Sequence, residues 1–146
     1  MSDVLTSDGI RLGAVATDKQ DALTQCGALL VGLGAATQEY ADALFDRETQ
    51  VSTYLGEGVA IPHGTNESRV HIRRTALGFI QFPAGVDWDG NTVNVCIPIA
   101  SNSDEHVGIL GALAEVLMEP DQAERLRTTT SIDEVLALLG GLGEDN

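Results

Sequence analysis

Apolar residues recur at helical spacing in the first third of the chain. Between Thr17 and Gly34 they fall three or four positions apart, which predicts an amphipathic helix, and Thr17 with Gln20 predicts a capping box at its start. A second amphipathic helix is predicted from about Thr37, and Arg47 falls near the edge of its apolar stripe. The two stripes consist of Ala22, Leu23, Cys26, Leu29, Leu30 and Leu33, and of Tyr40, Leu44 and Phe45.

The middle of the chain changes to a pattern typical of strands. Residues 75–82 are rich in β-forming side chains and are followed by Pro83, by Gly85 and by the turn pair at 89–90, so a strand and a turn region are predicted. A second strand is predicted where apolar residues alternate, at Val93, Val95, Ile97 and Ile99. Because Pro98 has no amide donor, we expect this strand to lie at an edge or to have a bulge near its end, and its pairing to stop early.

Helical spacing returns in the last third. Cap signals at 102–105 precede a stripe that begins at His106, Pro120 predicts the start of a short helix, and Ser131 with Glu134 predicts the cap of a final one. The interleaving of helices and strands favours an α/β fold in one domain, residues 1–146, with a frayed tail at 140–146.

Composition narrows the classes of partner. The chain has 146 residues with 8 Lys and Arg against 22 Asp and Glu, a formal charge of −14, which disfavours nucleic acid and anionic lipid and favours a basic protein. No apolar run approaches membrane-spanning length and no secretory leader is recognisable, so we expect no membrane insertion and a cytoplasmic location. Cys26 and Cys96 are far apart in sequence and are expected to be buried thiols.

His63 is the main candidate for chemistry. Pro62 restricts the backbone before it and Gly64 permits a turn or a close approach after it, so the imidazole should be held at a strand end. Neutral imidazole is a good nucleophile, and a hydrogen bond to one nitrogen can orient the other for covalent group transfer. The apolar segment 59–61 suggests a dry rim for partner proteins.

The other candidates each have a plain structural explanation. Arg47 could simply complement a helix dipole, and His106 could cover the end of an apolar stripe. The hydroxyls of Ser52 and Thr65 are possible phosphate ligands, although hydroxyls near turns often cap backbone groups. His71, among several arginines, is expected to be a solvated surface residue without a role. A metal site at His63 and His106 has no diagnostic spacing, and hydrolase, P-loop and dinucleotide motifs are missing.

Several segments together closely resemble one family. They are Arg47-Glu48, residues 52–65 (STYLGEGVAIPHGT), residues 79–83, Gly85-Val86, Ile99-Ala100 and Glu105-His106. The chain is similar to the enzyme IIA component of the bacterial phosphoenolpyruvate-dependent sugar phosphotransferase system, mannitol/fructose family. Its lead-in at 52–56 and its exit at 62–65 look most like the mannitol branch.

The resemblance implies a mixed β-sheet flanked by helices and a phosphoryl carrier in mannitol uptake. His63 would accept phosphate on Nε2 (the tele position) from the phosphocarrier protein HPr and pass it to a cysteine of a IIB component, which is often fused to membrane IIC. Arg47 and His106 would stabilise the phosphate, and no metal or other cofactor would be needed. The chain would act as a free-standing IIA.

Two alternatives remain open. A IIA-like protein could be regulatory, controlling a partner through its phosphorylation state instead of feeding transport. A noncatalytic interaction module or a metal-binding regulator could use the same histidines. Formation of acid-labile phosphohistidine would argue against the interaction module and the metal-binding regulator. It would not distinguish a transport IIA from a regulatory one.

Overall fold

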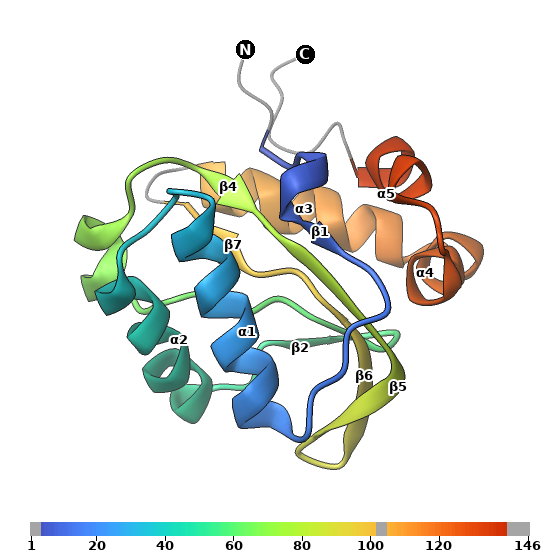
Figure 1. The fold of residues 1–146 in the computed structure, drawn as a ribbon, viewed down its shortest axis with the longest axis horizontal. Helices are drawn as coiled ribbons and strands as arrows, with labels where there is room; N and C mark the ends of the chain where they lie inside the picture. The colour runs from blue at the N-terminus through green and yellow to red at the C-terminus, as the bar shows by residue number, and fades with distance from the viewer. Residues whose placement is uncertain (1–3, 102–104, 140–146) are drawn as a thin grey trace.

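A mixed five-stranded sheet lies between two groups of helices in the computed structural model, which describes residues 4–101 and 105–139 (Figure 1). The strand order is β1-β5-β6-β3-β2, with β1/β5 and β3/β6 parallel and β5/β6 and β2/β3 antiparallel. A second sheet pairs β4 with β7 in antiparallel orientation. The strands are β1 Ile10–Arg11, β2 Tyr54–Gly56, β3 Val59–Ala60, β4 Ala76–Leu77, β5 Phe79–Trp88, β6 Asn91–Cys96 and β7 Ile99–Ala100. The predicted α/β class and mixed sheet are confirmed.

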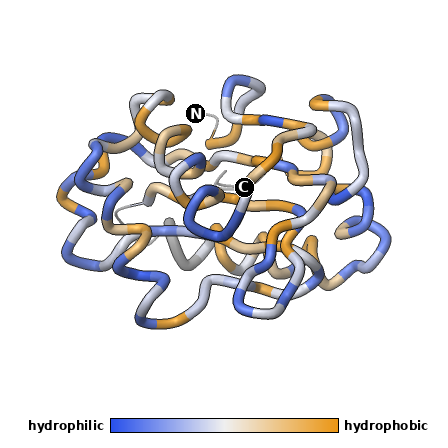
Figure 2. The backbone as a smooth tube through the Cα atoms, turned by 60° about the horizontal axis from the view of Figure 1, so that its bottom comes forward, coloured by the Kyte–Doolittle hydropathy of each residue, from blue (hydrophilic) through white to orange (hydrophobic). Residues whose placement is uncertain are grey.

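The helices cover the two faces of the larger sheet. One face carries α1 and α2, and the other carries α3, α4 and α5 (Figure 1). Hydrophobic segments run through the interior, while hydrophilic segments lie mainly at the periphery (Figure 2). The helices are α1 Lys19–Gly32, α2 Gln38–Gln50, α3 Glu105–Leu117, α4 Pro120–Thr128 and α5 Ile132–Leu139, with short 3-10 helices η1 Ser7–Gly9 and η2 Glu67–His71.

The first helix begins one residue later than the sequence predicts. Asp18 is its N-cap and accepts a hydrogen bond from the Asp21 amide at 2.8 Å, whereas Thr17 donates its own amide to the Asp21 carboxylate at 2.9 Å. A carboxylate suits this place because it also complements the positive end of the helix dipole. The capping box predicted at Thr17 and Gln20 is therefore wrong.

Gly27 lets α1 approach α2, since a Cβ there would lie 2.7 Å from that of Ala41.

The strands depart from the prediction in two ways. The predicted first strand is interrupted at Gly78, and β5 then continues through Pro83 and Gly85 as far as Trp88. The expected single face of the next strand is also wrong, because Val93 packs with the α1–α2 core while Val95 packs on the opposite side. The amides of residues 94 and 95 both donate to the Gly58 carbonyl, a bulge that reverses the alternation.

The expectations for β6 are also wrong. The strand ends at Cys96, but pairing does not stop there, because the Ile97 and Ile99 amides donate to the Ala60 and Pro62 carbonyls, both at 2.9 Å. The strand is not at an edge either, since it lies between β5 and β3.

Other expectations hold. Pro120 is the first residue of α4, and Ser131 Oγ accepts the Glu134 amide at the start of α5. Cys26 and Cys96 are both buried free thiols. The predicted cap at 102–104 and the frayed tail at 140–146 fall outside the described residues.

Candidate functional site

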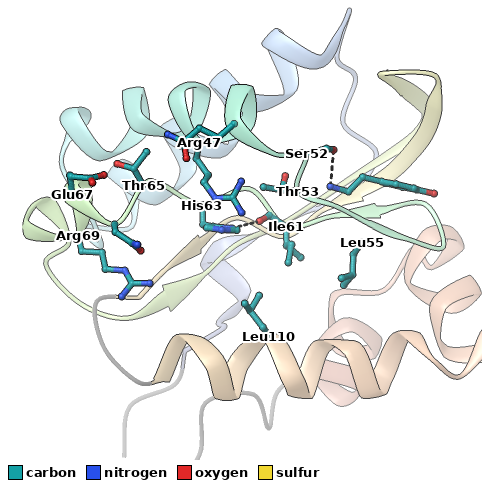
Figure 3. Close-up of a pocket in the computed structure, with 14 residues that line it drawn as sticks. Arg47, Ser52, Thr53, Leu55, Ile61, His63, Thr65, Glu67, Arg69 and Leu110 are labelled. Carbon is teal, nitrogen blue, oxygen red and sulfur yellow. Dashed lines mark hydrogen bonds between the residues drawn. The ribbon is translucent and has the colours of Figure 1, made fainter.

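A pocket of about 520 Å³ surrounds His63, and we call it the His63 pocket. The end of α2 and the chain leading into β2 form one wall, the loop from Ile61 into η2 forms another, and Leu110 projects from α3 across the opening (Figure 3). Its lining residues are Arg47, Gln50, Ser52, Thr53, Tyr54, Leu55, Ile61, His63, Gly64, Thr65, Asn66, Glu67, Arg69 and Leu110. Residues from distant parts of the sequence therefore converge on one histidine.

The backbone on both sides of His63 is fixed by hydrogen bonds. Ahead of it, the Pro62 carbonyl accepts the Ile99 amide at 2.9 Å, which carries the sheet pairing beyond the end of β3. Behind it, the Gly64 amide donates to the Tyr40 hydroxyl at 2.9 Å, and that hydroxyl donates to the Ile99 carbonyl at 2.7 Å. The expected placement of His63 just beyond a strand is confirmed.

Gly64 is required by the close approach of neighbouring groups and not by its φ, which lies outside the left-handed region. A Cβ at this position would lie 2.5 Å from the Ser68 hydroxyl and 2.6 Å from Cε1 of Tyr40. No side chain larger than hydrogen fits there without moving one of these groups. Tyr40 is only 2% exposed, so the aromatic ring that supports the loop is itself held in the core.

The His63 ring has a defined tautomer. Nδ1 lies 2.8 Å from the Ile61 carbonyl oxygen, which can only accept a hydrogen bond (Figure 3). Nδ1 therefore carries the hydrogen, and in the neutral ring the lone pair is on Nε2. Burial lowers the pKa of His63 below its ordinary value, and the charges of Arg47 and Arg69 lower it further, against the opposing effects of Ile61 and Glu48.

Arg47 lies in the last turn of α2 and reaches into the pocket above His63 (Figure 3). Its Nη1 donates to the Val51 carbonyl at 2.7 Å, beyond the end of the helix. The structural explanation considered from the sequence, a cation at a helix C-terminus, is therefore correct, and the same guanidinium also lines the pocket. One hydrogen bond leaves most of its five N–H donors for other acceptors.

Behind Arg47, a buried polar group supports the pocket wall. Glu48 is 7% exposed and accepts hydrogen bonds from the amide and hydroxyl of Thr53, from Nε1 of Trp88 at 3.0 Å and from Lys19 at 3.0 Å. We call Lys19, Glu48, Thr53 and Trp88 the Glu48 cluster. Thr53 in turn accepts the Ile61 amide at 3.0 Å, so the cluster braces the residue that orients the His63 ring.

The remaining predictions have mixed outcomes. Ser52 and Thr65 line the pocket, but their hydroxyls accept backbone amides of residues 54 and 68. His71 is half-buried at the end of η2, where its carbonyl accepts the Thr37 amide, and it is not among the described lining residues. His106 is the second residue of α3, but its side chain falls outside the described part of the chain.

The dry rim predicted at residues 59–61 is wrong. Val59 and Ala60 are fully buried in the sheet, and Ile61 lines the pocket but is only 7% exposed, so the segment is core and does not form a rim. The apolar groups at the pocket margin come instead from Leu55, which is 40% exposed, and from Leu110 on α3. Apolar residues beside a candidate histidine in a strand are more often buried than displayed.

Two residues of the site are not predicted from the sequence. In the sequence Tyr40 is only part of an apolar stripe, although its hydroxyl holds the loop after His63. Arg69 is one of the arginines near His71 and carries no signal of its own, yet it lines the pocket and acts on the pKa of His63. No periodic signal could reveal Arg69, because η2 is a 3-10 turn whose side-chain directions depend on where the loop packs.

The pocket can accept an anion next to a nucleophilic nitrogen. Two guanidinium groups and one carboxylate, that of Glu67, are its charged lining groups among the described residues. Within the same residues, no group of three or more His, Cys, Asp or Glu side chains could hold a metal ion. No helix in the described ranges is long and apolar enough to cross a membrane.

Comparison with known proteins identifies the family. A family model described as phosphoenolpyruvate-dependent sugar phosphotransferase system, EIIA 2, matches residues 3–140. A mannitol-specific phosphotransferase enzyme IIA component from Halalkalibacterium halodurans is 40% identical, with 97% of each chain covered. A multiphosphoryl transfer protein from Escherichia coli is 43% identical over 94% of this chain, which spans 37% of that protein's length.

A solved structure gives the same result. Enzyme IIAMTL from Escherichia coli, in a complex with phosphorylated enzyme IIBMTL, superposes with a TM-score of 0.87 at 37% identity, covering 93% of this chain and 96% of that one. The matches extend over nearly the whole sequence and include the strands and helices that form the His63 pocket. The chain therefore belongs to the EIIA 2 family of the phosphoenolpyruvate-dependent sugar phosphotransferase system and is a phosphotransfer component of it.

Proposed function

We propose that His63 is the phosphoryl acceptor of this protein and that Nε2 is the reacting atom. The observation that carries the proposal is the 2.8 Å contact between Nδ1 and the Ile61 carbonyl, which leaves the lone pair on Nε2. The lowered pKa of His63 keeps the ring neutral at physiological pH, and Arg47 lies close enough to affect that pKa. A neutral nucleophile beside a guanidinium suits a reaction that brings in a dianionic phosphoryl group.

Each transfer exchanges one bond to phosphorus for another. The Nε2 lone pair attacks the phosphorus of a donor phosphohistidine, the donor N–P bond breaks, and its electron pair returns to the donor imidazole. In the second step an acceptor thiolate attacks the same phosphorus and the Nε2–P bond breaks. Alignment of the reacting atoms and stabilisation of the phosphoryl oxygens supply most of the catalysis, and we assign the second task to Arg47 and His106.

The relatives suggest the acceptor and the sugar, and the family resemblance implies the donor. The Halalkalibacterium relative is named mannitol-specific, and the Escherichia coli structure holds IIAMTL with phosphorylated IIBMTL. We propose that this chain takes phosphate from HPr, passes it to a cysteine of a mannitol-type IIB component, and works in the cytoplasm. Leu55 and Leu110 at the pocket margin offer apolar contacts to both partners, which would bind in turn.

Reconstitution tests the proposal. The protein is incubated with phosphoenolpyruvate, enzyme I and HPr, and the labelled peptide is identified under conditions that preserve phosphohistidine. We expect label on His63 in the wild type, none in His63→Gln, and normal label in the matched control His71→Gln. Label on another residue, or normal label in His63→Gln, would overturn the assignment.

A second stage separates transport from regulation. The phosphorylated protein is mixed with a mannitol-type IIB–IIC permease, and phosphate is followed onto mannitol. Transfer to mannitol supports the transport function. Formation of phospho-His63 without transfer to any sugar-specific IIB would favour the regulatory alternative, for which a structural relative exists in the nitrogen regulatory IIA protein of Neisseria meningitidis, at 28% identity.

A further inference from the structure

We propose that Arg69 is a second phosphate-binding residue of the His63 pocket and acts together with Arg47. This inference rests on the proposed function, because it assigns a ligand to the phosphoryl group carried by His63. Arg69 lies in η2 and lines the pocket from the side opposite the chain that leads into β2 (Figure 3). The two arginines therefore approach the same space from different elements.

The backbone of Arg69 is tied to the His63 loop. Ser68 donates both its amide and its hydroxyl to the Thr65 carbonyl, at 3.1 and 2.7 Å, and is itself buried beneath Gly64. The Arg69 amide donates to the Asn66 carbonyl at 3.2 Å, and its own carbonyl accepts the Ile72 amide. This arrangement places the start of the Arg69 side chain at a set position relative to His63.

Arg69 differs from the other half-buried arginines in its hydrogen bonds. Arg47 donates to the Val51 carbonyl and Arg127 donates to the Glu57 carbonyl, each at 2.7 Å. For the Arg69 guanidinium, no hydrogen bond or ion pair is found with any of the described residues. A half-buried guanidinium with unused donors in a pocket is suited to an anionic ligand, and its planar fork matches phosphate oxygens.

Electrostatics supports the same position. Burial lowers the pKa of His63 and raises that of Tyr40, and the charge of Arg69 adds to the first shift and opposes the second. Its field therefore reaches both the ring and the hydroxyl that holds Gly64. The whole chain carries a formal charge of −14, which opposes the arrival of a dianion. Arg47 and Arg69 are two of only 8 basic residues, and both are in this pocket. Together they can contact more than one oxygen of the phosphoryl group.

Two substitutions and a matched control test the role. Arg69→Gln removes the charge, Arg69→Lys keeps it without the fork, and Arg73→Gln removes a charge from an exposed neighbour that does not line the pocket. The measurements are the rate of phosphate transfer from phospho-HPr and the pKa of the phosphoryl group in phosphorylated protein, followed by phosphorus NMR. Losing one charge-assisted hydrogen bond should slow transfer about 10- to 100-fold in Arg69→Gln.

The phosphorus measurement distinguishes binding of phosphate from support of the fold. In Arg69→Gln the pKa of the phosphoryl group should rise, because the dianion loses a cation, while Arg69→Lys should lie between Gln and wild type. Equal rates and equal phosphoryl pKa in Arg69→Gln and Arg73→Gln would overturn the proposal. So would a slower rate with an unchanged phosphoryl pKa, which would place Arg69 against the partner protein. If wild-type protein forms no phospho-His63, the proposed function itself fails.

Discussion

The last turn of α2 contributes Arg47 and Glu48 to two polar regions that differ in how their charges are matched. In the Glu48 cluster, one carboxylate meets Lys19, Trp88 and Thr53, so its charge and its oxygen atoms are matched inside the protein. In the His63 pocket, Arg47 and Arg69 flank a neutral imidazole in an open cavity of about 520 Å³. The first arrangement stabilises the fold, and the second has an excess of positive charge that an anionic ligand can neutralise.

The largest expected effect separates activity from stability in the His63 pocket. His63→Gln removes the nucleophile and should reduce phosphorylation by phospho-HPr to background. The ring is half-buried, and Gln can also donate a hydrogen bond, so the free energy of unfolding should change by only about 1 kcal/mol. Radiolabel transfer and urea denaturation of the same preparations provide the check. A strongly destabilised variant would mean that the ring serves the fold.

In the Glu48 cluster the opposite result is expected. Glu48→Ala leaves the Thr53 amide and hydroxyl and the Trp88 indole N–H without their acceptor in a buried place, while Lys19 keeps only its ion pair with Asp89. The unsatisfied donors together should cost about 3–5 kcal/mol in the free energy of unfolding. Asp46→Ala, an exposed carboxylate on the same helix, is the matched control and should change stability little. Urea denaturation measures both. Similar losses in the two variants would show that the cluster is not a special feature of the fold.

Tyr40 connects the core to the pocket and should show an intermediate effect. Tyr40→Phe removes the hydroxyl that accepts the Gly64 amide and donates to the Ile99 carbonyl, so we expect a loss of about 1–3 kcal/mol and slower transfer. Tyr54→Phe is the control for stability, because its hydroxyl makes a longer bond of 3.3 Å to the Gly58 amide. Equal stability of the two variants would mean that the Tyr40 hydroxyl does not hold the His63 loop.

The same contrast explains what could be predicted from the sequence. Local rules predict the long helices and the fixed backbone around His63, since spacing, proline and glycine act within a few residues. The bulge that reverses the faces of Val93 and Val95 depends on pairing with Gly58, more than thirty residues away. Local patterns carry no information on such pairing.

The residues of the site also differ in whether local patterns predict them or tertiary packing places them. His63 and Arg47 stand in a recognisable pattern, and the structure places both in one pocket. Arg69 lines the pocket, and the Tyr40 hydroxyl holds the loop after His63, only because η2 and α2 pack beside that loop. The prediction for residues 59–61 fails for a related reason, because an apolar strand looks the same in sequence whether its side chains are exposed or buried.

The smallest expected effect is the pH dependence of stability. The two regions should lose their contributions to the free energy of unfolding in different pH ranges. Because the pKa of His63 is below 6.5 in the folded protein, the unfolded state binds more protons as the pH falls below 6.5, and stability should decrease there. For Glu48, burial raises the pKa but the bonds from Thr53 and Lys19 prevail and lower it, so its contribution is present above pH 4.5 and lost on further acidification. The free energy of unfolding is measured by urea denaturation across this pH range. The decrease below pH 6.5 should be absent in His63→Gln, and the decrease below pH 4.5 should be absent in Glu48→Gln. Parallel curves for wild type and His63→Gln below pH 6.5 would contradict a ring held neutral by its surroundings.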